Sequence, residues 1–240
     1  MKERIIAMIP ARIGSTRLKI KNLALLDNKP LISYAIDAAN ESKVFDRIII
    51  NSDNTIFNKV AERYKAEFYL RPKRLGGSQI KSDQVVEDFV YNNPCDIIVW
   101  VNPIAPLQSS EEIQKIILYF QENNLDTLFT VKKEKVHSMY KNAPLNYSYD
   151  EVFAQTQDLE PVVLYVYSLM MWRTKPFIAK IKSEGNAFYT GKIGHFEVDK
   201  ISGIIVKDKM DLLIAELMIL ARKKKQNYIV KYDKLFKEVE

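Results

Sequence analysis

Short apolar runs alternate with longer amphipathic segments through the first half of the chain. The runs hold several consecutive apolar residues, which predicts buried strands at 4–11, 47–53, 67–70, 96–102 and 126–131. The segments between them carry apolar residues three or four positions apart, which predicts helices at 30–42, 54–64, 82–92 and 110–122. Because the strands are continuously apolar rather than alternating, we expect an α/β fold with a mostly parallel sheet covered on both faces.

The pattern changes between about 134 and 162, where Tyr, Asn, Gln and Pro accumulate without helical spacing. We expect an excursion of short strands and loops there. The regular pattern then returns, with a long strand at 161–173, a helix at 174–185, edge strands within 195–206 and a terminal amphipathic helix at 207–225. Since no repeat or low-complexity linker interrupts the sequence, residues 1–240 are expected to form one domain with an arm.

The composition is that of a soluble protein, with 47% hydrophobic and 28% charged residues in 240. No apolar stretch reaches the roughly 18 residues that a membrane span needs. The amino-terminal segment does not read as a signal peptide. One cysteine, Cys95, permits no internal disulfide, which fits a reducing compartment. We therefore expect a cytoplasmic protein that does not contact membrane.

A formal charge of +6 indicates acidic partners. The positive residues are divided among separate segments, at 12–21, 71–81, 132–135 and the carboxyl-terminal end. Aromatic residues are not interleaved with them, so nucleic acid is not the expected partner. Basic loops spread along a chain can instead converge on one small molecule rich in phosphate.

The segment behind the first strand has the composition of an anion-binding loop. It reads PARIGSTRLKIKN and combines Arg12 and Lys21 with Gly14 and Ser15. It matches neither the Walker P-loop nor the GxGxxG pattern. Gly14 can adopt a positive φ, Ser15 and backbone amides can face phosphate oxygens, and the cations can neutralise them. An ordinary basic turn is the alternative. Because ligands of parallel sheets bind beyond the carboxyl ends of the strands, we expect this loop on the functional edge.

An ordered set of motifs extends the argument along nearly the whole chain. They are IPARIGSTRLKIKN, NKPLISYAIDAA, YLRPKRLGG, WVNPIAPLQS and DLLIAE. In this order they resemble the acylneuraminate (CMP-sialic acid) synthetase family of cytidylyltransferases, of which the chain would be a divergent member. The resemblance implies a three-layer, Rossmann-like nucleotidyltransferase fold. It also implies a β-rich dimerisation arm at about 134–173, through which a homodimer forms.

The reaction that the resemblance implies is activation of an acidic sugar by CTP. The anomeric hydroxyl of a 2-keto-3-deoxy sugar of the nonulosonic, sialic type would attack the α-phosphorus, giving a CMP-sugar and pyrophosphate. Such products serve surface polysaccharide synthesis. The partners would be CTP, the acidic sugar and a second copy of the chain.

The resemblance also assigns roles to residues of this sequence. Arg12 and Lys21 would be catalytic. The nucleotide would be bound by Arg12, Ser15, Asn22, Arg71, Ser82 and Asn102. For Arg71 the simpler alternative is a surface arginine before a proline, and for Ser82 it is a helix cap. Asn102 stands where the family usually has glutamine.

The chain contains two histidines, His137 and His195. His137 lies in a segment that resembles the family's histidine-containing segment, so a role at the sugar site is one reading. A loop histidine bonded to backbone is the other. His195 has no argued partner in the sequence, and the two histidines with one cysteine do not make a zinc site.

The sequence departs from the family in its substrate-facing half. The resemblance implies Mg²⁺ as cofactor, yet the two metal-binding aspartates of the family fall on Ile205 and Lys207. The family's QPTSP turn has become NPIAP, which loses hydroxyls at Ile104 and Ala105. Its asparagine–glycine strand has become LYVYSLMMW.

Three explanations of the missing aspartates stay open. Neighbouring carboxylates could hold the metal, with Asp208, Asp211 and Asp199 as weak candidates, although Asp211 could equally stabilise a helix N-terminus. The ammonium of Lys207 could take the place of the cation. Alternatively, the chain is a weak or silent homologue that binds nucleotide or sugar as an assembly subunit. A nucleotidyltransferase with a different acidic acceptor is a further alternative.

Overall fold

A computed structural model describes residues 2–15, 17–77, 79–224 and 230–232. Seven strands form one sheet in the order β11-β7-β10-β6-β1-β4-β5. The strands are β1 (Ile5–Ala11), β4 (Arg47–Ser52), β5 (Glu67–Leu70), β6 (Ile97–Val101), β7 (Thr127–Glu134), β10 (Val162–Arg173) and β11 (Ile193–Glu197). Every neighbouring pair is parallel except the two that include β10, which runs antiparallel between β6 and β7.

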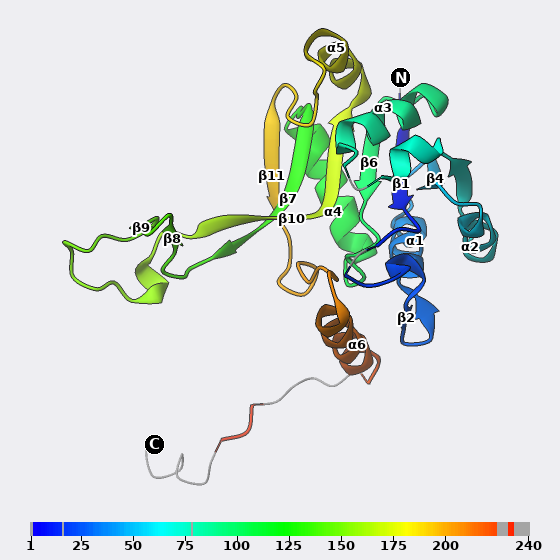
Figure 1. Cartoon of the computed structure of the whole chain (residues 1–240). Helices are drawn as coiled ribbons and strands as arrows, with labels where there is room; N and C mark the ends of the chain where they lie inside the picture. Colours follow the sequence, from blue (N-terminus) through cyan, green and yellow to red (C-terminus); the bar gives the residue numbers. More distant parts are fainter. Residues whose placement is uncertain (1, 16, 78, 225–229, 233–240) are drawn as a thin grey trace.

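Helices cover both faces of this sheet (Figure 1). The helices are α1 (Leu31–Ser42), α2 (Ile56–Tyr64), α3 (Ser82–Asn92), α4 (Ser110–Glu122), α5 (Thr174–Glu184) and α6 (Lys209–Lys223). Apolar residues of α1, α2 and α4 pack on one face, against the odd-numbered residues of β1, and those of α3 and α5 pack on the other. The three-layer arrangement and the mostly parallel sheet are therefore confirmed.

The helix α6 packs outside these layers, in a third apolar cluster. Its residues Ala215 and Ile219 contact Leu26 and Leu31, which lie around the start of α1. Leu26 belongs to a small hairpin of β2 (Leu25–Leu26) and β3 (Lys29–Pro30). The predicted end of the terminal helix, residue 225, lies outside the described residues.

Residues 135–161 project away from the body of the molecule between β7 and β10 (Figure 1). They contain the two-residue strands β8 (Met139–Tyr140) and β9 (Ala143–Pro144) and a 3₁₀ turn, Thr156–Asp158. The resemblance to the family predicts an arm at about 134–173. In the structure the last part of that range, Leu169–Arg173, pairs with β6 at the centre of the sheet, so the projecting arm is shorter.

Within the described residues, no helix is both long enough and apolar enough to cross a bilayer.

Candidate active site

A cavity of about 340 Å³ opens where parallel strands of the sheet end. Three segments line it: the loop after β1, the stretch from the end of β5 into α3, and the end of β6 with the turn that follows. All seven residues to which the sequence assigned nucleotide or catalytic roles are among the lining residues, namely Arg12, Ser15, Lys21, Asn22, Arg71, Ser82 and Asn102. Residues up to 90 positions apart therefore meet at the edge expected from parallel-sheet topology.

Three cations from the loop after β1 line this cavity: Arg12, Arg17 and Lys21. Burial lowers the pKa of the Lys21 ammonium below its ordinary value of 10.5, and the charges of Arg17 and Arg12 lower it further. Asp211 and Asp208 act in the opposite direction and more weakly. Cations that destabilise one another's charge form a site to which a polyanion binds favourably.

Lys21 also joins this loop to the segment before α6. Its Nζ donates a hydrogen bond to the carbonyl oxygen of Val206, at 3.0 Å. Lys21 begins a 3₁₀ turn, Lys21–Leu23, in which the side chain of Asn22 is buried. The ammonium is thus held at a fixed position before any ligand arrives.

Arg71 lies on the floor of the cavity and is only 5% exposed, so it is not a surface arginine. Its Nη1 donates to the carbonyl oxygen of Asn51 at 3.1 Å, and its Nη2 to that of Ala11 at 3.3 Å. Burial lowers the pKa of the guanidinium, while the charge of Asp53 raises it. The ends of β1 and β4 therefore hold Arg71 in one orientation.

Ser82 and Asn102 have different surroundings from those expected. Ser82 is the first residue of α3, and Lys81 occupies the cap position. The side-chain amide of Asn102 donates to the carbonyl oxygen of Tyr167 at 3.1 Å, and its backbone N–H donates to that of Ser168 at 2.9 Å. Asn102 therefore lines the cavity and also connects it to β10.

The part of β10 that Asn102 contacts is irregular. The register with β7 shifts between Tyr165 and Met170, and Tyr167 has φ 56°. A left-handed conformation costs a bulky residue roughly 1–2 kcal/mol. Such strain persists where the surroundings impose it, and it is common at functional sites.

Aromatic side chains gather beside this bulge. Tyr167 stacks on Tyr165, with ring centroids 5.0 Å apart and planes 14° apart, and meets Phe188 edge-on. Burial, and next a hydrogen bond with Tyr189, raise the pKa of Tyr167 to about 12. The hydroxyl of Tyr165 lies 2.9 Å from Nε2 of His195. The sequence alone indicates no partner for His195.

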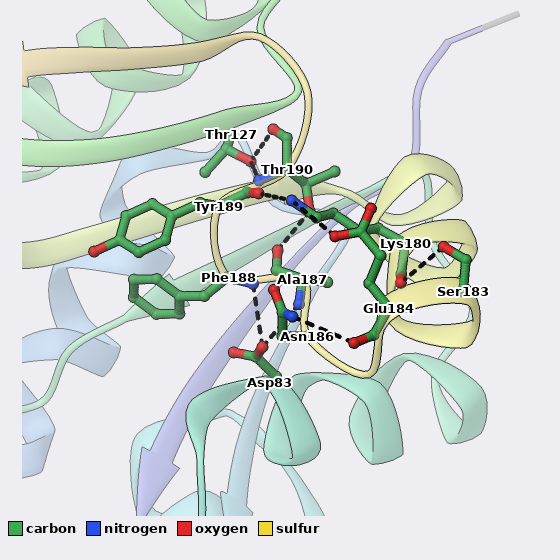
Figure 2. Close-up of polar contacts among 10 residues, drawn as sticks. All are labelled: Asp83, Thr127, Lys180, Ser183, Glu184, Asn186, Ala187, Phe188, Tyr189 and Thr190. Carbon is green, nitrogen blue, oxygen red and sulfur yellow. Dashed lines mark hydrogen bonds and ion pairs between the residues drawn. The ribbon is translucent and has the colours of Figure 1, made fainter.

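The loop that carries Phe188 and Tyr189 is fixed by Asp83, as Figure 2 shows. The Asp83 carboxylate accepts hydrogen bonds from the backbone N–H groups of Ala187, at 2.8 Å, and Phe188, at 3.2 Å. Trp172 Nε1 donates to the carbonyl oxygen of Phe188 at 2.9 Å. Because Asp83 directly follows Ser82, the first turn of α3 links the cavity to the aromatic loop. Only the adjacency to Ser82 could have signalled this residue in the sequence.

The carboxylates considered for Mg²⁺ are occupied at the start of α6. Asp208 Oδ1 accepts from the backbone N–H groups of Met210 and Asp211, and Asp211 Oδ2 accepts from those of Lys207 and Asp208. This reciprocal pair is a capping box. Asp199 likewise accepts from the backbone N–H of Ile201.

The described residues do not by themselves provide a complete set of ligands for a metal ion. Over these residues, no group of three or more His, Cys, Asp or Glu side chains is arranged to hold one. The side chain of Lys207 is exposed, and Lys207 is absent from the described lining of the cavity. His137 also lies elsewhere, in the arm, where its ring stacks on Phe153 at 4.6 Å.

A cationic cavity at the carboxyl edge of an α/β sheet is typical of proteins that bind phosphate-bearing ligands. The model of the cytidylyltransferase family matches residues 6–209 of this chain, and the chain belongs to that family.

Individual relatives agree with this membership. The chain is 26% identical to an N-acylneuraminate cytidylyltransferase of Streptococcus agalactiae serotype V, over 96% of this chain and 58% of that protein. It is 28% identical to a pseudaminic acid cytidylyltransferase of Campylobacter jejuni, over 73% of this chain and 83% of that protein. The chain thus spans little more than half the length of the streptococcal relative.

The fold also matches solved structures. CMP:2-keto-3-deoxy-manno-octonic acid synthetase complexed with CTP superposes with a TM-score of 0.69 at 11% identity, over 91% of this chain and 99% of that one. At this identity the match concerns the fold alone.

Proposed function

We propose that this chain is a CTP-dependent cytidylyltransferase that activates an acidic 2-keto-3-deoxy sugar of the nonulosonic type and releases pyrophosphate. The observation that carries the proposal is the convergence of the seven predicted residues on one cavity, which three cations of the loop after β1 line. Leu75, Ile80 and Val85 also line this cavity. A nucleoside triphosphate combines a polyanionic end with a flat, less polar end, so both kinds of lining residue have a counterpart in it.

In the proposed reaction the sugar's anomeric hydroxyl oxygen forms a bond to the α-phosphorus as the bond to pyrophosphate breaks, and the hydroxyl proton passes to solvent water. Negative charge then accumulates on the leaving pyrophosphate. Arg12 and Lys21 stabilise this charge, and Lys21 needs little reorganisation because its ammonium is already bonded to Val206. The fixed guanidinium of Arg71 orients the nucleotide for in-line attack.

The aromatic face beside Asn102 is the proposed site of the sugar. Tyr165 and Tyr189 are exposed and supply aromatic surface there, and the Tyr167 ring stacks on that of Tyr165. Small-molecule sites combine such surface with a few polar groups that fix orientation. The hydrogen bond from Asn102 to the Tyr167 carbonyl keeps this face next to the nucleotide cavity.

Mg²⁺ enters no step of this proposal, because the described carboxylates do not form a site for it. A cationic role for Lys207 stays a prediction. The arm supports the proposed homodimer: Val152 is 94% exposed and Phe153 is 81% exposed, and apolar surface of this kind is typical of interaction sites. A cytoplasmic location stays part of the proposal.

A silent homologue is the second candidate, and one observation favours it: the described carboxylates that could have held a metal act as caps instead. Pyrophosphate release from CTP separates the two candidates. The acceptors to test are N-acetylneuraminic acid, pseudaminic acid and 2-keto-3-deoxy-manno-octonic acid, each with and without Mg²⁺. Release with one of them supports the enzyme. Thermal stabilisation by CTP without release from any acceptor supports the silent homologue.

A further inference from the structure

Arg71, on the cavity floor, forms a buried ion pair with Asp53. Arg71 Nη2 and Asp53 Oδ1 are 3.7 Å apart, and their side chains are 5% and 14% exposed. Asp53 directly follows β4, whereas Arg71 directly follows β5, so the pair joins the ends of neighbouring strands. The Nη2 atom of Arg71 thus lies close to the Asp53 carboxylate as well as donating to the carbonyl oxygen of Ala11.

The Asp53 carboxylate also lies against Gly76, whose neighbours in the chain line the cavity. A Cβ atom added to Gly76 would overlap the Asp53 carboxylate, with Oδ2 as its nearest neighbour. Gly76 ends a 3₁₀ turn, Lys73–Gly76, and its neighbours Leu75 and Gly77 both line the cavity. Only glycine at position 76 leaves room for Asp53 in this position.

The pair is incompletely hydrogen-bonded. Neither Arg71 Nε nor Asp53 Oδ1 has a hydrogen-bond partner in the part of the chain that the structure describes, and both atoms are buried. Asp53 thus holds Arg71 by charge at 3.7 Å, and the Nε–H of Arg71 is left as a donor. Buried polar groups of this kind usually have a hydrogen-bond partner.

We propose that Asp53 is a positioning residue for the nucleotide: it fixes the guanidinium of Arg71 and the turn that ends at Gly76, and so shapes the floor and one wall of the cavity. This inference rests on the proposed function, since it takes CTP as the ligand. No contact between Asp53 and CTP is part of it.

The direction in which CTP affinity changes in Asp53→Asn distinguishes positioning of Arg71 from a general effect of the negative charge. As a negative charge near a polyanion site, Asp53 opposes CTP binding, so its removal in Asp53→Asn would tighten binding. As the residue that orients Arg71, its removal weakens binding. We predict that Asp53→Asn raises the Kd for CTP about tenfold, the size of one hydrogen bond to a charged group.

Two further variants separate positioning from loss of fold. Gly76→Ala keeps the charge of Asp53 but displaces its carboxylate, and is predicted to weaken CTP binding as well. In an Arg71→Gln background, Asp53→Asn is predicted to add little, because the two residues act as one unit. A merely structural aspartate would give additive or no effects on Kd.

The test is calorimetric titration of the full chain with CTP, with thermal unfolding of each variant as the check of folding. Asp46→Asn is the matched control, since Asp46 lies just before the other end of β4 and its carboxylate accepts from Ile5 N–H. Unchanged or tighter binding by Asp53→Asn overturns the inference, as does full additivity with Arg71→Gln. If the unaltered protein does not bind CTP, the proposed function itself falls.

Discussion

Asn102 donates a hydrogen bond from its side-chain amide to the carbonyl oxygen of Tyr167, at an N···O distance of 3.1 Å. Tyr167 is the residue of the β10 bulge with a left-handed backbone, at φ 56°. The bond therefore ties the nucleotide cavity to a strained segment 65 positions away in sequence.

Removing this bond is predicted to destabilise the protein. In Asn102→Ala the Tyr167 carbonyl loses its donor, which costs about 1–3 kcal/mol of unfolding free energy. Urea unfolding measures it. The control is Asn92→Ala, whose amide donates to the Asp88 carbonyl at an exposed position, at 2.8 Å, and whose loss is expected to cost less than about 0.5 kcal/mol. Equal losses for the two variants would show that the bulge needs no support from Asn102.

Asp83 is predicted to stabilise the protein through the loop that carries Phe188 and Tyr189, and not only as a residue at the start of α3. The Asp83→Ala variant leaves two backbone N–H groups of the aromatic loop without their acceptor (Figure 2). Bonds to a charged acceptor contribute about 1.5–3 kcal/mol, so a loss of that size is expected in denaturant unfolding. Asp150→Ala, in the exposed part of the arm, is the control and is expected to change little. A stable Asp83→Ala protein would mean that the loop is held by its other contacts.

We predict that the protein takes up protons at Lys21 when CTP binds. Its pKa lies below 10.5 in the free protein because of burial and the neighbouring arginines. A triphosphate beside the ammonium raises that pKa, so CTP binding takes up protons in the pH window just below 10.5. In the same window the free protein gains stability as pH rises, because the unfolded chain binds more protons there than the folded one.

Calorimetry in buffers of different ionisation enthalpy measures this uptake. It is expected to disappear in Lys21→Met and to persist in the control Lys19→Met, since Lys19 lies in the same loop but does not belong to the described lining. Binding heats that do not depend on the buffer would contradict the assignment of Lys21 to the triphosphate.

Asp211 is predicted to act as a cap and not as a metal ligand. Asp211→Ala removes the acceptor for the backbone N–H groups of Lys207 and Asp208, which costs about 0.5–2 kcal/mol. Any dependence of turnover on the Mg²⁺ concentration is expected to be unchanged. A variant of normal stability that needs far more Mg²⁺ would reverse this assignment.

Local signals were sufficient to predict most of the framework. Continuous apolar runs located the strands, and the predicted helix at 82–92 coincides with α3. The direction of β10 was not predictable, because LYVYSLMMW is equally apolar in a parallel or an antiparallel strand. Its pairing with β6 also explains why the projecting arm ends earlier than expected.

Within the site, residues that act through their type and order, such as those of the basic loop, could be predicted from the sequence. Residues that act through contacts made only in the fold could not. Asp83 meets its partners 104 and 105 positions away, and nothing near Tyr167 indicates a left-handed backbone in a bulky residue. Arg71 was predicted as a binding residue, but its burial depends on carbonyl groups from two other strands.

The central claim is that the cations behind β1 hold the triphosphate of CTP, and a titration of Arg12→Gln/Lys21→Gln with CTP tests it most directly. The unaltered protein and Lys19→Gln are predicted to bind CTP with similar affinity, and the double variant at least about 100-fold more weakly, since two charge-assisted contacts are lost. Equal affinity in all three proteins would contradict the account.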